Sequence, residues 1–141
     1  MHRLRRLVAL LALSPVLACG GNECTEIDCD SVLEVDYGMV VVNEPYWLTI
    51  DPQGSKITVV CLADTPDAEP LPDWLACDAG GFTITGELAD TTTTLNVAVV
   101  PLSTEEAVIP NALVPLMVDE IDEPNGPGCP PKCVTRRGVV N

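Results

Sequence analysis

Seven cysteines are the residues of this sequence with the most specific chemistry. A thiol can accept a lipid, bind a metal ion or form a disulfide. Cys24 with Cys29, and Cys129 with Cys133, have the close spacing of metal-ligand pairs, although neither has the two-residue gap that is typical of a zinc ribbon. The N-terminal sequence decides which of these chemistries is expected.

Residues 1–18 have the features of an export signal. Three arginines precede an apolar run over residues 7–13, which is too short to span a bilayer because a spanning helix needs roughly 20 apolar residues. The following segment, Val16 to Cys19, resembles the lipobox of bacterial lipoprotein precursors. The resemblance implies cleavage before Cys19, a diacylglyceryl group on its sulfur, and an acyl chain such as palmitate on the new amino terminus.

An ordinary secretory signal cleaved after Ala18 is the alternative, because Val16 and Ala18 also fit the rule for that cleavage. Cysteine parity favours the lipobox, since a lipidated Cys19 leaves an even number of thiols in an oxidising compartment. We therefore predict disulfides among Cys24, Cys29, Cys61, Cys77, Cys129 and Cys133. Six cysteines allow 15 connectivities. Our hypothesis pairs Cys61 with Cys77, Cys24 with Cys29, and Cys129 with Cys133.

Catalytic chemistry finds little support. His2, the only histidine, leaves with the signal, so serine or cysteine nucleophiles lack their usual base and mixed Cys/His zinc sites are excluded. Acids of the run Asp119 to Glu123 could act as paired carboxylates on a glycan, or bind calcium as Asp28 and Asp30 could. A solvated acidic loop is the simpler interpretation. We predict no enzyme, no cofactor and no metal site.

Two tryptophans could bind a sugar face. Trp47 and Trp74 are the only large aromatic candidates for such a platform, but core packing is the expected role of both.

The expected mature chain is strongly acidic. It has four basic residues against 21 acidic ones, which gives a formal charge of −17, and such a surface should repel nucleic acid and anionic lipid. Residues 19–30 are predicted to form a short lipidated tether. Gly20 at the second mature position predicts the outer membrane if the enteric sorting rule applies. Membrane attachment should therefore come from the lipid.

The remainder, residues 31–141, is predicted to be one all-β domain. Tyr37 shares a face with Leu33 and Val35, and the segment Phe82 to Leu88 alternates in the same way. That segment and residues 95–100 are predicted to form a hairpin through a turn around Asp90. The expected strands are 31–37, 40–42, 46–50, 57–62, 82–88, 95–100, 112–121 and 133–140. This pattern predicts an immunoglobulin-like antiparallel β-sandwich stabilised by disulfides.

Prolines and acids mark the connections. Pro115 should confine its strand to an edge or a bulge. Residues 64–72 are expected to form an exposed loop that Trp74 and Leu75 pin to the core. Ser103 and Glu106 could begin a helix, but Pro110 limits it to about one turn.

Residues 123–133 resemble a Cys- and Pro-rich C-terminal element of uncharacterised lipoproteins from myxobacteria and related deltaproteobacteria. The resemblance implies a small all-β lipoprotein and brings no activity. We expect a non-catalytic binding or structural module of the cell envelope, with an envelope protein or a glycan as its partner. The alternatives are an envelope enzyme that uses paired carboxylates on a glycan, and a lipoprotein that binds calcium or a small ligand.

Overall fold

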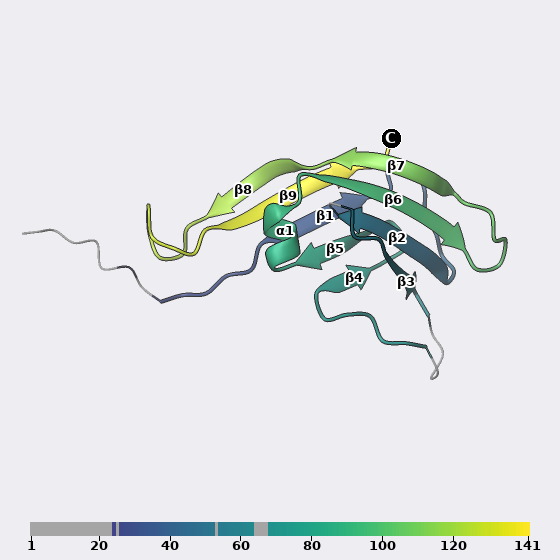
Figure 1. Ribbon diagram of the computed structural model, residues 1–141, viewed down its shortest axis with the longest axis horizontal. Coiled ribbons are helices and arrows are strands. Elements are labelled where there is room, and N and C mark those ends of the chain that lie inside the picture. Colours follow the sequence, from purple (N-terminus) through teal and green to yellow (C-terminus); the bar gives the residue numbers. More distant parts are fainter. Residues whose placement is uncertain (1–23, 25, 53, 64–67) are drawn as a thin grey trace, which may run out of the picture.

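Two β-sheets pack face to face in the computed structural model, which describes residues 24, 26–52, 54–63 and 68–141 (Figure 1). The five-stranded sheet has the order β4-β5-β1-β9-β8, made by Leu75–Cys77 (β4), Gly81–Thr85 (β5), Val32–Asp36 (β1), Cys133–Val139 (β9) and Met117–Asp122 (β8). The four-stranded sheet has the order β3-β2-β6-β7, made by Ile57–Cys61 (β3), Tyr46–Pro52 (β2), Thr94–Pro101 (β6) and Ile109–Pro115 (β7). This is the disulfide-containing β-sandwich that the sequence predicts.

The core consists of side chains from the two inner sheet faces. Leu33, Val35 and Tyr37 are buried, as their alternation predicts. Leu95, Val97 and Val99 on β6 face them from the other sheet and are also buried. The buried residues of the two sheets belong to one hydrophobic cluster, so both sheets contribute to a continuous apolar layer.

A pair of tyrosines adds a hydrogen-bonded chain to this core. The hydroxyls of Tyr37 and Tyr46 are 3.2 Å apart, and Tyr46 donates to the carbonyl oxygen of Asp78 at 2.8 Å. Burial is the main cause that raises the pKa of Tyr37 and of Tyr46 above the ordinary tyrosine value. Both phenols therefore remain neutral hydrogen-bonding groups at neutral pH.

One strand pairing has a large effect on the architecture. All neighbouring strands are antiparallel except β1 and β9, which are parallel with Val32 opposite Thr135. The chain before β1 therefore runs in the same direction as the chain before β9. In Figure 1, β8 and β9 extend beyond the rest of the sandwich, and the N-terminal segment follows them. We call residues 117–139 the β8–β9 ribbon.

The predicted hairpin of residues 82–88 and 95–100 is wrong. β5 ends at Thr85, and the chain forms helix α1 (Glu87–Thr91) before it enters β6 in the other sheet. Gly86 permits this change of direction because its φ is +86°. Ala89 of α1 is fully buried, so the helix fills one end of the sandwich instead of turning the chain back.

Three further elements differ from prediction. Residues 112–121 contain parts of two strands, β7 and β8, which lie in different sheets and are separated by the buried Leu116. Residues 40–42 form no strand, and Val42 instead donates its backbone N–H to Ala79. The three-residue β4 was not expected. Pro115 ends β7, which is an edge strand as predicted.

Candidate functional site

An apolar groove of about 670 Å³ lies along the outer edge of β3. Its volume is in the range of ligand-binding pockets in proteins. One wall is the edge strand itself, and the opposite wall is the chain that leads toward β4. The lining residues come from both walls and from the neighbouring loops: Pro45, Trp47, Ile57, Thr58, Val59, Val60, Ala63, Ala68, Glu69, Pro70, Leu71, Pro72 and Leu102.

Trp47 is the largest exposed side chain of this groove, and the prediction that it packs in the core is wrong. Its neighbours Tyr46 and Leu48 on β2 are fully buried, so strand alternation points Trp47 outward, where the residue is 45% exposed. It lies between Val60 of β3 and Val100 of β6 on the outer face of the sheet. Trp74, in contrast, is partly buried and packs against the core.

β3 presents its backbone to the groove. Four consecutive residues, Ile57 to Val60, line the cavity although their side chains alternate between the two sheet faces. A groove lined in this way runs along the strand. Within the described ranges, no backbone hydrogen bond joins residues 57–60 to a residue outside the sheet. Every second N–H and C=O group on this edge is therefore available to a ligand.

Disulfide Cys61–Cys77 has the pairing that the sequence predicts, and it lies at the end of β3, beyond the lining residues Ile57 to Val60. It joins the last residue of β3 to the last residue of β4, with the Cα atoms 5.8 Å apart. The bond thereby connects the edges of the two sheets. Leu102 and Pro45 meet at the same end, where the Leu102 N–H donates to the Pro45 carbonyl at 2.9 Å.

The groove has an acidic surrounding. Glu69 lines it and is exposed. Glu44 directly precedes the lining residue Pro45. Glu105 lies near the lining residue Leu102, because its backbone N–H donates to the carbonyl of the preceding residue, Pro101. Lys56, directly before β3, is a basic residue next to the lining strand. The net field favours a ligand with positive charge.

The other two disulfides correct the predicted connectivity. Cys24 is bonded to Cys129 and Cys29 to Cys133, with Cα separations of 5.6 and 6.0 Å. Both bonds follow from the parallel alignment of β1 with β9, which carries the preceding segments side by side. A bond between Cys24 and Cys29 would require a local turn that brings their Cα atoms within about 7 Å, and each of the two cysteines is instead bonded to a cysteine of the ribbon.

Asn125 completes this attachment, which we call the tether clamp: the two disulfides and Asn125. Its side-chain oxygen accepts the Ile27 N–H at 2.8 Å, and its amide nitrogen donates to the Ile27 and Pro130 carbonyls at 3.0 and 2.7 Å. The buried side chain thus pairs with the tether as a strand neighbour would. The clamp holds Cys24, Ile27 and Cys29 against the end of the β8–β9 ribbon.

The acids of the ribbon do not form a paired-carboxylate site. Asp119, Glu120 and Asp122 are exposed on β8, and Asp119 lies 3.4 Å from Arg137. Glu123 lies 2.6 Å from Lys132, whose ammonium group lowers the pKa of Glu123. Among the described residues, the three main pockets contain one carboxylate at most, Glu69 or Glu87.

No metal-binding cluster accompanies these acids. In the part of the chain that the structure describes, no three His, Cys, Asp or Glu side chains are placed to hold a metal ion. Asp28 and Asp30 are exposed on the clamped segment. Calcium binding therefore has no preformed site among these residues.

Comparison of the chain with protein-family models, curated proteins and solved structures found no significant match. The predicted lipidation site, Cys19, and residues 1–18 lie outside the described residues. No helix in the described ranges is long and apolar enough to cross a membrane. The groove is the candidate site with the most specific geometry. Sequence reasoning missed it, although the alternation of Tyr46, Leu48 and Ile50 around Trp47 contains the signal.

Proposed function

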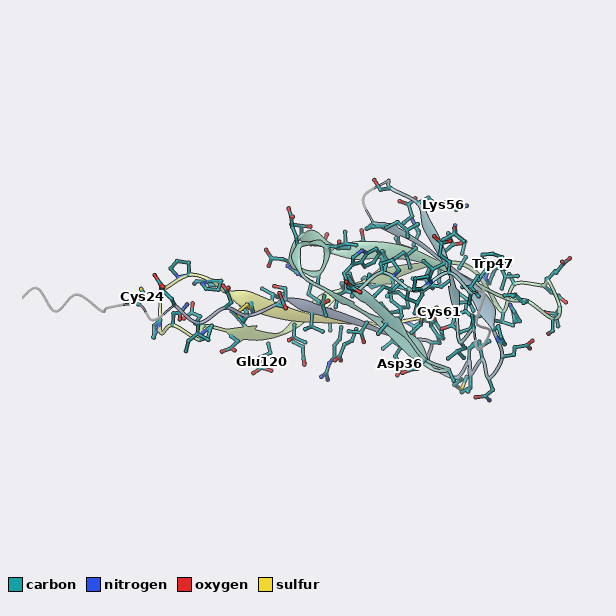
Figure 2. All side chains as sticks on the ribbon, turned by 90° about the horizontal axis from the view of Figure 1, so that it is seen from below. Cys24, Asp36, Trp47, Lys56, Cys61 and Glu120 are labelled. Atoms are coloured by element: carbon teal, nitrogen blue, oxygen red, sulfur yellow. A yellow bond between two sulfur atoms is a disulfide. The ribbon has the colours of Figure 1, made fainter. Side chains whose placement is uncertain are left out.

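We propose that this chain is a lipid-anchored, non-enzymatic binding module of the bacterial cell envelope. The observation that supports the proposal is the arrangement of its two ends. Figure 2 shows Cys24 at one end of the long axis of the molecule and Trp47 toward the opposite end. A lipid on Cys19, five residues before Cys24, would attach the clamped end to the membrane and direct the β3 groove away from it.

The architecture suits presentation of a binding site. The tether clamp joins Cys24 and Cys29 to the ribbon by two disulfides, so the clamped segment and the sandwich would present the groove as one covalently connected unit. Apolar lining with few polar groups favours binding over acid–base chemistry. The acidic surface favours attachment through lipid, and Gly20 favours the outer membrane under the enteric rule.

The anchor can be tested with the full-length precursor in a bacterium that processes lipoproteins. The wild-type chain should partition into detergent, and Cys19→Ser should leave an uncleaved precursor without lipid. A Cys19→Ser product that is cleaved normally and is soluble would instead support the ordinary secretory signal.

The binding role can be tested in the same cells with a photo-crosslinking amino acid at position 60, on the groove, or at position 120, on the exposed ribbon. Position 60 should give an adduct of one defined mass that disappears when Trp47→Ala is added and persists with Trp74→Phe. Equal labelling at positions 60 and 120, or an adduct insensitive to Trp47→Ala, would contradict the proposal.

A further inference from the structure

We infer that the β3 groove binds an extended, positively charged peptide segment of a partner protein as an additional strand of the four-stranded sheet. The inference rests on the proposed binding role and specifies its ligand. In such β-augmentation, main-chain hydrogen bonds supply affinity and alternate side-chain pockets supply selectivity.

The four sheet edges differ in how well they are protected against pairing with another strand. β7 contains Pro110 and Pro115, and its pairing with β6 shifts register between Val97 and Val99. β8 carries three acids and a register shift after Val118, and β4 has only three residues. Prolines, charges, bulges and short length are the devices that protect edges from pairing.

β3 lacks these devices. Its five residues, Ile-Thr-Val-Val-Cys, contain no proline and no charge, and its pairing with β2 is regular over the whole strand. It is also the edge along which the groove runs. Of the four edges in the described chain, β3 is thus the one that combines an unprotected backbone with space for a ligand.

The side chains beside this edge also suit an added strand. A strand added to β3 would direct alternate side chains to opposite sheet faces. On the outer face they would meet Trp47 and Val60, and on the other side they would meet Ile57, Val59 and the wall around Leu71. Both sides are apolar and suit β-branched or aliphatic residues.

The acidic residues around the groove complement a basic peptide. Glu69 lies in the groove, Glu44 and Glu105 lie next to residues at its Cys61 end, and the expected mature chain has a formal charge of −17 from four basic and 21 acidic residues. Basic residues that flank the apolar core of a peptide would gain favourable interactions with this surface. An acidic peptide would be repelled.

The test uses purified chain from residue 19 onward, with its disulfides formed, and a fluorescein-labelled peptide of alternating valine and threonine with lysines at both ends. We expect saturable binding by fluorescence anisotropy. N-methylation of each central peptide nitrogen removes the main-chain donors and should weaken binding about tenfold or more. Glutamates in place of the lysines should also weaken binding, and added salt should reduce that difference.

Hydrogen exchange provides a second measurement that locates the peptide. Alternate amides within residues 57–60 should become protected when the lysine-flanked peptide binds, and those of β8 should not change. Trp47→Ala should reduce affinity, whereas Trp74→Phe, away from the groove, should not.

The possible failures are distinguishable. If the N-methylated and unmodified peptides bind equally, or no peptide protects β3, then strand addition is wrong, while a Trp47-dependent adduct at position 60 in cells would still support the binding role. If that adduct is also absent, both proposals fail. Tighter binding of the glutamate-flanked peptide would overturn the charge argument alone.

Discussion

Tyr37 donates a hydrogen bond to Tyr46 across the core, with 3.2 Å between the two hydroxyl oxygens. The direction follows from the next bond, because Tyr46 uses its own proton to donate to the Asp78 carbonyl at 2.8 Å. Tyr46 therefore has a partner on each side, whereas Tyr37 ends the chain. The rings also meet edge to face, with centroids 6.1 Å apart.

This order predicts unequal effects of removing the two hydroxyls. Tyr46→Phe leaves the buried Tyr37 hydroxyl without its acceptor and Asp78 without its donor, and should cost about 2 to 3 kcal/mol. Tyr37→Phe keeps the bond from Tyr46 to Asp78 and should cost about 1 kcal/mol. Urea unfolding of both variants gives the comparison. A larger loss for Tyr37→Phe would mean that the donor direction is reversed.

The same pair predicts a loss of stability at alkaline pH. Burial raises the pKa of both phenols in the folded chain, so the unfolded chain releases these protons first as the pH rises through the ordinary tyrosine pKa of about 10. The contribution of these two phenols to folding stability should be fully present below about pH 10 and should decrease as the pH rises above it. Urea unfolding at several pH values measures the slope. Tyr37→Phe should make the alkaline decline shallower.

The two disulfides of the tether clamp should not contribute additively. With Cys29–Cys133 intact, Cys24–Cys129 closes only a small ring of roughly ten residues, so its removal should cost about 3 kcal/mol in the chain-entropy model. Removal of Cys29–Cys133 with Cys24–Cys129 intact should cost the same. Loss of both opens a ring of roughly a hundred residues as well and should cost about 7 to 8 kcal/mol.

The stability lost on removing both disulfides should thus exceed the sum of the two single losses by about 2 kcal/mol. Denaturant unfolding of cysteine-to-serine variants that lack one bond or both would measure this difference. Purely additive losses would show that the two bonds constrain independent segments of the unfolded chain.

Gly138 on β9 is packed so closely that a Cβ atom there would force its neighbours to move. A Cβ atom there would lie 2.5 Å from Val114 Cγ1 and 2.8 Å from Leu116 Cδ2, where the chain passes from β7 to β8. Gly138→Ala should therefore destabilise the fold by about 1 to 3 kcal/mol. Gly80→Ala is the matched control, because its Cβ would meet only Asp78 at an ordinary 3.7 Å. Thermal unfolding of both variants checks the difference, and equal midpoints would contradict the close packing at Gly138.

The outward position of Trp47 can be measured by fluorescence quenching. Acrylamide should quench a readily accessible component that belongs to Trp47, which is 45% exposed, and a less accessible one that belongs to the partly buried Trp74. Trp47→Phe should remove the accessible component, and Trp74→Phe should retain it. The opposite assignment would place Trp47 in the core and would remove the groove.

The sequence predicts features that depend on neighbouring residues. The alternation of Leu33, Val35 and Tyr37, and that of residues 95–100, is enough to identify strands and their buried faces. Cys61–Cys77 was also predictable, because its two ends are only 16 positions apart and flank one loop. In these cases the decisive information lies within a short stretch of the chain.

The features that could not be predicted depend on contacts between distant segments. The disulfides of the tether clamp require knowledge that β1 and β9, about a hundred residues apart, lie parallel. The polar residues around Asp90 fit a hairpin turn as well as a helix, and the burial of Ala89 against the sandwich decides between them. The groove needs β3 to be an edge strand, which only the sheet order establishes.

The tether clamp also determines how the molecule bears mechanical load. A pull on the chain before Cys24 passes through Cys24–Cys129 and Cys29–Cys133 into the end of the ribbon. β1, whose hydrogen bonds join β5 and β9 near the centre of its sheet, then carries little of that tension. Without the two bonds, the same pull would act directly on Val32 and peel β1 from its neighbours. The first elements to resist such a pull are therefore two covalent bonds, and not the hydrogen bonds of a strand.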